Sequence, residues 1–149
     1  MTERLAVHGG KPVRDTLLPY GRQHIDQDDI DAVIAVLSSD WLTTGPMVHR
    51  FEAEFALYTG TKHAVAVSNG TAALHAAMFA LDIQPGDEVI VTPMTFAASA
   101  NCVLYQGGIP VFADVDPDTL LIDPDEVGRR ITPGTRAIVA VDYTGQPCD

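Results

Sequence analysis

The stretch Ser68-Asn-Gly-Thr-Ala-Ala-Leu-His75 decides how the fold of this chain can be interpreted. Before it, His63-Ala-Val-Ala-Val67 has the composition of a short buried strand, and after it come many Ala, Leu and Met residues, which favour a helix. We therefore predict a strand over 63–67, a tight polar turn, and a helix over 71–82. Gly70 lets the backbone turn sharply and approach a ligand closely, and Thr71 is a suitable residue to begin the helix.

The residues of this turn leave two interpretations open. The first turn of a helix carries N–H groups without partners and the positive end of the helix dipole, and both favour a bound phosphate. In the alternative, Ser68, Asn69 and Thr71 only cap the helix, because short motifs often match by chance. The stretch lacks both the Gly-Lys-Ser/Thr of a Walker A loop and the Gly-x-Gly-x-x-Gly of a dinucleotide-binding fingerprint. The rest of the chain has to decide between the two.

The composition is that of a globular chain with an acidic surface. Of the 149 residues, 46% are hydrophobic, and the mean hydropathy is +0.10, which suits one domain with a buried core. The 20 acidic and 9 basic residues give a formal net charge of −11. Such a surface repels nucleic acids and anionic membranes, so we expect neither as a partner.

The cysteines and the N-terminus bear on metal binding and location. Cys102 and Cys148 show no metal-ligand spacing such as Cys-x-x-Cys, so we expect no metal site. The start of the chain lacks the apolar core of a signal peptide, and no apolar run approaches the length of a membrane span. Two thiols without an export signal indicate a reduced, cytoplasmic location.

The N-terminal part of the chain is typical of an irregular arm followed by two helices. Residues 1–19 are interrupted by glycine and proline, and we treat them as the arm. A first helix is expected to begin at Asp26 or Asp29, and a second to cover 47–58. Trp41 lies in the loop between them, where the only tryptophan of the chain serves either packing or recognition.

From residue 63 onward, predicted strands alternate with predicted helices. The continuous apolar run at Glu88–Thr92 is typical of a strand that is covered by helices on both faces. Repeated strand–helix units imply right-handed crossovers and a mainly parallel sheet, so the predicted fold class is an α/β three-layer sandwich. The predicted strands are 63–67, 88–92, 110–113 and 137–141, and the later predicted helices are 96–105 and 123–130.

We predict one incomplete domain over residues 20–149, preceded by the arm. The last predicted strand ends shortly before Asp149, so the sequence has the pattern of the front portion of a longer protein. A domain that lacks later strands of its sheet is expected to expose apolar sheet and helix surface and to self-associate.

Ligands of an open parallel sheet bind beyond the carboxyl ends of its strands. Three such ends carry candidate residues, namely Gly70–Ala72, Pro93–Phe96, and Asp114 with Asp116. A phosphate at the first end places an attached aromatic ring near the second, where Phe96 would stack on it; in the alternative, Phe96 belongs to the core. Asp114 and Asp116 are expected to start a turn, and we find no Ser–His–Asp arrangement.

Short sequence blocks follow one another between residues 18 and 149. They are Pro19-Tyr-Gly-Arg-Gln23, Asp40-Trp-Leu-Thr-Thr-Gly-Pro46, Ser68-Asn-Gly-Thr-Ala-Ala-Leu-His75, Pro85-Gly-Asp-Glu-Val-Ile90, Thr95-Phe-Ala-Ala-Ser-Ala-Asn101, Gly108-Ile-Pro-Val-Phe-Ala-Asp114 and Thr144-Gly-Gln-Pro-Cys-Asp149. In this order and spacing they resemble the DegT-type sugar aminotransferases, fold-type I enzymes that use pyridoxal 5′-phosphate (PLP). The resemblance implies the N-terminal part of the large domain of that fold, preceded by a helical arm.

Within that family, the first, second and last blocks look closest to the UDP-4-amino-4,6-dideoxy-N-acetyl-β-L-altrosamine transaminases of pseudaminic acid synthesis. The resemblance implies that the whole protein moves an amino group from an amino acid, with glutamate expected, to C4 of a UDP-4-keto-6-deoxy sugar in the synthesis of pseudaminic acid or another amino sugar. It also implies a homodimer in which each site is completed by the partner subunit.

The resemblance assigns binding roles to particular residues. It implies that Gly70, Thr71 and Ala72 bind the PLP phosphate and that Phe96 stacks on the pyridine ring. It further implies that Tyr20 and one loop line the sugar-nucleotide site. The loop residues are Asp40, Trp41, Leu42 and Thr43.

The resemblance assigns no catalytic residue to this chain. The family's Schiff-base lysine, and the aspartate that pairs with the pyridine nitrogen, lie beyond residue 149. Lys11 and Lys62 are the only lysines of the chain and neither matches that position, so we expect the chain alone to be inactive. Two alternatives stay open: a PLP-dependent sugar dehydratase, in which histidine replaces the lysine, and a truncated non-catalytic module that binds phosphate or oligomerises.

Overall fold

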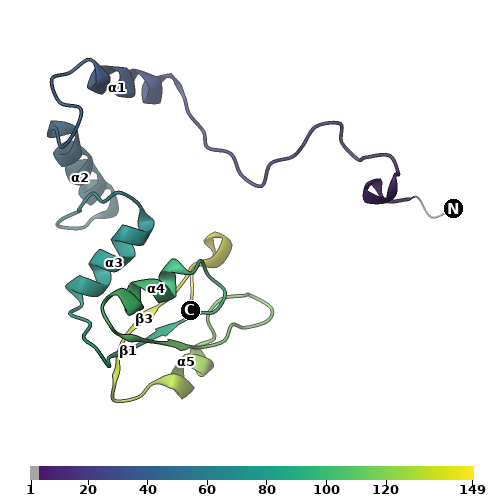
Figure 1. Ribbon diagram of the computed structural model, residues 1–149, viewed down its shortest axis with the longest axis vertical. Helices are drawn as coiled ribbons and strands as arrows, with labels where there is room; N and C mark the ends of the chain where they lie inside the picture. The colour runs from purple at the N-terminus through teal and green to yellow at the C-terminus, as the bar shows by residue number, and fades with distance from the viewer. Residues whose placement is uncertain (1–3) are drawn as a thin grey trace. The chain divides into compact units, whose positions relative to one another are not determined.

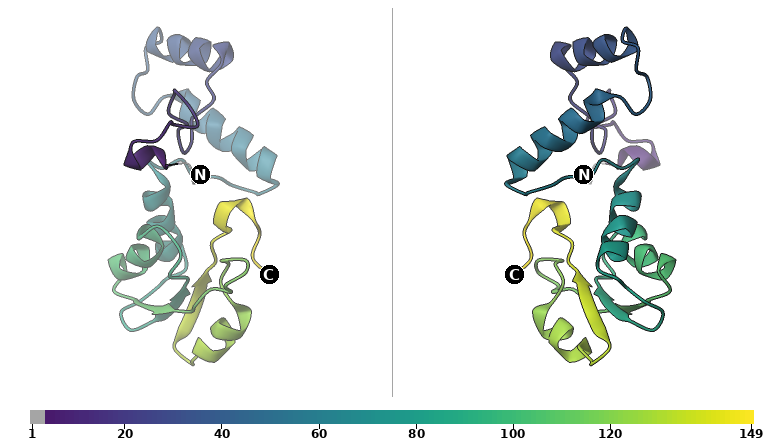
Figure 2. Two further views of the ribbon diagram at one scale, coloured as in Figure 1. Left: turned by 90° about the vertical axis from the view of Figure 1, so that its right-hand side faces the viewer. Right: turned by 90° about the vertical axis from the view of Figure 1, so that its left-hand side faces the viewer.

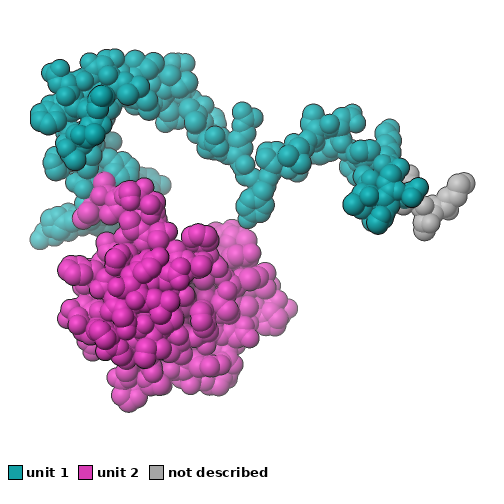
Figure 3. Space-filling view, viewed as in Figure 1, with its two compact units in different colours: residues 1–64 teal, residues 65–149 magenta. Residues whose placement is uncertain are grey.

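The structure is a computed structural model that describes residues 4–149 (Figure 1). The chain divides into two compact units, the first ending at Ala64 and the second covering Val65–Asp149 (Figure 3). The predicted domain boundary between residues 19 and 20 stays a prediction, and residues 1–3 of the predicted arm lie outside the described residues.

The first unit contains two α-helices, α1 (Gln27–Leu37) and α2 (Pro46–Thr59). Asp26 caps α1, because its side chain accepts hydrogen bonds from two backbone N–H groups of the first turn. Pro46 occupies the first turn of α2, where its missing N–H costs nothing, and Gly60 ends the helix with a φ of 69°. Both predicted helices are confirmed. An irregular segment with one short 3₁₀ turn, Ala6–His8, precedes them.

Three short parallel strands form the sheet of the second unit. They are β1 (Glu88–Val91), β2 (Ile109–Phe112) and β3 (Thr135–Val139), and their order in the sheet is β2-β1-β3. β1 lies in the centre and pairs in parallel with both neighbours, so the carboxyl ends of all three strands lie at one edge. The predicted parallel α/β sheet is confirmed, with β3 slightly earlier in the chain than predicted.

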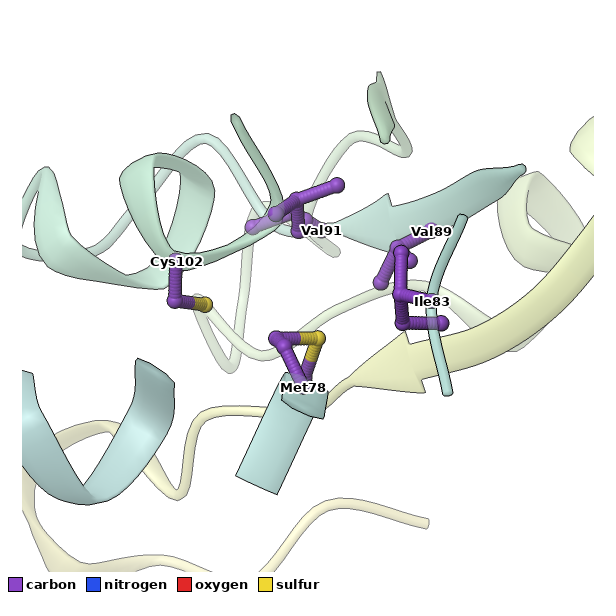
Figure 4. Packing of buried hydrophobic residues seen from close by; sticks show 6 residues of the cluster. Met78, Ile83, Val89, Val91 and Cys102 are labelled. Atoms are coloured by element: carbon purple, nitrogen blue, oxygen red, sulfur yellow. The ribbon is translucent and has the colours of Figure 1, made fainter. Parts of the chain in front are cut away.

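Helices cover both faces of the central strand. α3 (Gly70–Ala80) and α4 (Ala98–Tyr105) pack on one face, and α5 (Pro124–Arg130) packs on the other (Figure 2). The first face has a core of buried residues from α3, α4, β1 and the connection between α3 and β1, and Figure 4 shows their packing. They are Met78, Ile83, Val89, Val91, Cys102 and Val103. On the second face, Ile90 packs with Ala113 and Ile122, and Val127 of α5 covers them. The apolar run of β1 therefore has the helical cover on both faces that the sequence predicts.

The predicted strand at 63–67 is wrong. This segment is irregular, and among residues 4–149 no strand forms a hydrogen-bonded ladder with it. A strand exists only where a neighbouring strand pairs with it, and the composition of a segment cannot supply that neighbour. The start of the next helix also differs from the prediction, because Asn69 caps α3 and Thr71 lies inside its first turn.

Apolar side chains remain exposed on the second unit, as expected. Phe112 on β2, Ile138 on β3 and Phe79 on α3 are all exposed. Self-association through this surface stays a prediction. Within residues 4–149, no helix has the length and the apolar character that crossing a bilayer requires.

Replacing isoleucine at two positions of the sheet tests the central role of β1. Ile90 is 0% exposed, so we expect Ile90→Ala to lower the free energy of unfolding by about 2–4 kcal/mol through lost contacts and a cavity. Ile138 on β3 is 48% exposed, and Ile138→Ala is expected to cost about 1 kcal/mol or less. Urea unfolding followed by circular dichroism measures both losses. Equal losses would contradict the assignment of β1 as the core strand.

Candidate functional site

The candidate site begins at the N-terminus of α3. The side-chain Oδ1 of Asn69 accepts a hydrogen bond from the Ala72 N–H at 2.9 Å, and the Asn69 carbonyl accepts one from the Ala73 N–H at 3.1 Å. Among the described residues, no acceptor is hydrogen-bonded to the N–H groups of Gly70 and Thr71. Two donors at the positive end of an 11-residue helix are therefore available to an anion.

The space in front of Gly70 is open. Gly70 is exposed, and a Cβ built on it would meet no atom within 4 Å. Its φ lies outside the left-handed region, so the packing and backbone of this unit do not require glycine there. Glycine is about 0.5–1 kcal/mol less favourable than alanine inside a helix, a cost that a close approach by a ligand would explain.

Phe96 lies at the same edge of the sheet as Gly70. α3 ends at Ala80 and the chain then enters β1 at Glu88, so the helix runs back along the strand and begins near the strand's carboxyl end. Phe96 follows β1 at that end, just before α4, which packs beside α3. Its side chain is 78% exposed, so Phe96 is not part of the core of this unit, and its stacking on a ring stays a prediction.

Hydroxyl groups hold the loop that carries Phe96. Thr92 is buried at the end of β1, and its Oγ1 accepts a hydrogen bond from the Met94 N–H at 3.2 Å. The Oγ1 of Thr95 lies 2.8 Å from the Oγ of Ser99 in the first turn of α4. These bonds tie the loop to the strand before it and to the helix after it, so Phe96 extends from a constrained backbone.

The acidic residues after β2 form a turn, as predicted. The Oδ1 of Asp116 accepts hydrogen bonds from the N–H groups of Thr119 and Asp118, both at 2.9 Å. These two bonds lower the pKa of Asp116 below its ordinary value, because they stabilise the carboxylate form. Asp116 is therefore a turn-forming carboxylate and a poor candidate for proton transfer near neutral pH.

The two cysteines are unsuited to nucleophilic chemistry. Both are free, and burial raises the pKa of the Cys102 thiol and of the Cys148 thiol. A raised pKa leaves both groups as neutral thiols at neutral pH. Within residues 4–149, no group of three or more His, Cys, Asp or Glu side chains is placed to hold a metal ion.

The residues predicted to bind a sugar nucleotide belong to the first unit. Tyr20 is fully exposed in the segment before α1, and residues 40–43 form the connection between α1 and α2. Trp41 lies close to Gly45, where an added Cβ would come within 2.7 Å of the Trp41 Cβ, but Trp41 is 60% exposed, so packing and recognition both stay open. Its side chain also lines an apolar cavity of about 260 Å³ between the two helices. That these residues share a site with Gly70 stays a prediction.

Asn69 is the residue of this site that sequence reasoning did not assign to it. Asparagine is among the preferred N-cap residues, so its position just before the predicted helix was a usable signal. The signal was ambiguous, because Ser68 and Thr71 have hydroxyl groups that also cap helices. Only the hydrogen bond to the Ala72 N–H identifies the cap.

The comparison with known proteins decides the family. The sequence pattern of the DegT/DnrJ/EryC1/StrS aminotransferase family matches residues 23–149. The chain belongs to this family. The spore coat polysaccharide biosynthesis protein SpsC of Bacillus subtilis (strain 168) is 48% identical over 136 residues, which are 91% of this chain and 35% of SpsC.

Solved structures in the family share the fold. Spr1654 from Streptococcus pneumoniae, solved in a PLP-form and in a PMP-form, superposes with a TM-score of 0.84 at 37% identity over 89% of this chain. The match covers 34% and 33% of those two chains. The sugar aminotransferase CalS13 from Micromonospora echinospora gives a TM-score of 0.81 at 39% identity, over 89% of this chain and 36% of CalS13. The fold is therefore the N-terminal part of aminotransferase fold type I, and the chain spans about a third of the length of these relatives.

The pH dependence of the free energy of unfolding tests whether the Asp116 carboxylate stabilises its turn. The folded pKa lies below the ordinary value of 3.8, so the contribution of Asp116 to stability is fully present above that value and is lost as the pH falls through the folded pKa. We expect the free energy of unfolding of Asp116→Asn to fall less steeply than that of the wild type between about pH 4 and pH 2.

Urea unfolding at a series of pH values measures the two slopes. Asp118→Asn is the control, because the Asp118 carboxylate accepts no hydrogen bond within this turn. Its slope should match that of the wild type. If all three slopes coincide, Asp116 does not stabilise the turn through its carboxylate.

Proposed function

We propose that this chain supplies the cofactor-phosphate site of a PLP-dependent sugar aminotransferase. The observation that carries the proposal is the pair of unengaged N–H groups at Gly70 and Thr71, at the edge of the sheet where Phe96 also lies. The family and the PLP- and PMP-forms of Spr1654 support the identity of the anion. PLP, when bound, supplies an electron sink for the negative charge that develops when the substrate carbon loses its proton.

Each residue of the site has a stated task in this proposal. The turn Gly70–Ala72 holds the phosphate and so fixes one end of the cofactor. The ring of Phe96 covers one face of the pyridine ring and keeps water from that face. Hydrogen bonds within the loop between Thr92 and Ser99 constrain the backbone that carries Phe96.

The substrate proposal goes further than the cofactor proposal. We propose that the whole protein transfers an amino group from glutamate to C4 of a UDP-4-keto-6-deoxy sugar, in the synthesis of pseudaminic acid or another amino sugar, in the cytoplasm and as a homodimer. Tyr20 and residues 40–43 would line the sugar-nucleotide site. The order of the sequence blocks supports this proposal, and the name of SpsC places that relative in polysaccharide biosynthesis.

Amino transfer requires a residue that this chain does not supply. The second unit contains no lysine, and Lys11 and Lys62 lie in the first unit at positions that do not match the family's catalytic lysine. We assign the proton transfer of the amino-transfer reaction to none of the described side chains near Gly70. We therefore propose that the chain binds the cofactor and that further residues complete the reaction.

Activity measurements test the function directly. We expect the protein expressed from the complete reading frame that contains this chain to bind PLP, seen by absorbance, and to aminate a UDP-4-keto-6-deoxy sugar with glutamate. The 149-residue chain alone should give no product with the same substrates, because neither of its two lysines matches the family's Schiff-base lysine. A complete protein that neither binds PLP nor transfers an amino group would refute the proposal. Product from the chain alone would refute the assignment of the missing residue.

Binding of pyridoxamine 5′-phosphate (PMP) to the chain tests the role of Phe96. Phe96→Ala is expected to raise the Kd for PMP about fivefold to tenfold, because ring stacking contributes about 1 kcal/mol or more. Its effect on stability should be small, because the side chain is 78% exposed. Affinity for inorganic phosphate should not change.

The matched control is Phe79→Ala, because Phe79 is 74% exposed on α3. This variant should bind PMP like the wild type. Fluorescence titration measures the Kd values. Equal weakening by both substitutions, or by neither, would mean that Phe96 does not contact the ring.

A further inference from the structure

Asn69 decides which amides of α3 a phosphate can reach. Its Oδ1 lies 2.9 Å from the Ala72 nitrogen, and the donating N–H is directed at that oxygen. A backbone amide has a single hydrogen, so the Ala72 N–H cannot also be donated at full strength to an anion. The backbone donors that remain in the first turn are those of Gly70 and Thr71.

The orientation of the Asn69 amide is held on its other side. Its Nδ2 donates to the Oγ of Ser68 at 3.4 Å, which directs the Oδ1 toward the helix. The first turn also contains the Thr71 hydroxyl, which has no hydrogen-bond partner among the described residues. Two amides and one hydroxyl of the first turn are therefore available as donors to an anion, together with the helix dipole.

Among the described α-helices with a side-chain cap, α3 has a neutral cap and α1 and α5 have charged caps; α2 and α4 have no side-chain cap. Asp26 and Asp123 cap α1 and α5, and further acidic residues follow in the first turns of both. The first turn of α3 has no acidic residue, which is also true of α2 and α4. Asparagine and aspartate cap helices about equally well, so capping alone does not account for a neutral side chain. A carboxylate at position 69 would lie beside a bound phosphate and repel it.

We propose that Asn69 is a positioning residue for the cofactor phosphate: it withholds the Ala72 N–H and directs the phosphate to the N–H groups of Gly70 and Thr71 and to the Thr71 hydroxyl. The inference rests on the proposed function and refines it. Ala72 then helps to shape the turn without donating to the phosphate.

Amide NMR of the isotope-labelled chain, titrated with PMP, tests the division of donors. The amide proton signals of Gly70 and Thr71 should move downfield and saturate with PMP, because they form new hydrogen bonds to a charged acceptor. The Ala72 signal should change little, because its partner stays the same. A saturable downfield shift of Ala72 as large as the other two would overturn the proposal.

Two variants test the need for a neutral cap. Asn69→Asp keeps the capping oxygen, so its Tm should stay close to that of the wild type, while its Kd for PMP rises about tenfold or more through charge repulsion. Gln106→Glu adds the same charge at the opposite end of α4, which lies at the other edge of the sheet, and its Kd should change less than about twofold. A purely structural cap at position 69 would leave the affinity of Asn69→Asp unchanged, and that result would overturn the proposal.

The outcomes separate this inference from the proposed function. If the wild-type chain binds PMP with shifts at Gly70 and Thr71, but Ala72 shifts equally and Asn69→Asp binds as tightly, only the role of Asn69 is overturned. If the wild-type chain binds no PMP, the cofactor site at α3 and the role of Asn69 are overturned together.

Discussion

The packing of α3 against the central strand is the interaction on which the site depends. Met78 is buried in the same cluster as Val89 and Val91, and Cys102 and Val103 of α4 complete it (Figure 4). This contact fixes both the rotation of α3 and the direction in which it runs. Because the helix runs back along β1, its first turn lies at the carboxyl edge of the sheet. The position of the two free amides follows from the apolar core beneath them.

The proposed site holds a phosphate in an acidic chain without a cationic side chain. The formal net charge is −11, and the second unit has no lysine. Its three arginines form ion pairs elsewhere: Arg129 and Arg130 with Glu126, and Arg136 with Asp87. Backbone N–H groups and a helix dipole provide a local positive potential that the net charge does not remove. The absence of acidic residues from the first turn of α3 preserves that potential.

The sequence correctly predicts those helices and strands that are marked by residues within or directly next to the element itself. Asp123 followed by Pro124 marks the start of α5, and the apolar run of β1 needs only its own composition. The strand predicted at 63–67 failed because strand formation depends on a partner strand, which no local pattern reveals. The two possible roles of Phe96 were open for a related reason: an aromatic residue after a strand can belong to the core or contact a ligand. The sequence does not show which side chains cover it, and in this unit it is 78% exposed.

The central claim is that the first turn of α3 holds the phosphate of the cofactor. A crystal structure of the chain bound to PMP tests it most directly. The account predicts phosphate oxygens within about 2.7–3.2 Å of the Gly70 and Thr71 nitrogens, with the Phe96 ring against the pyridine ring. PMP bound elsewhere on the chain, with the start of α3 free of phosphate and Phe96 directed away from the ligand, would contradict it.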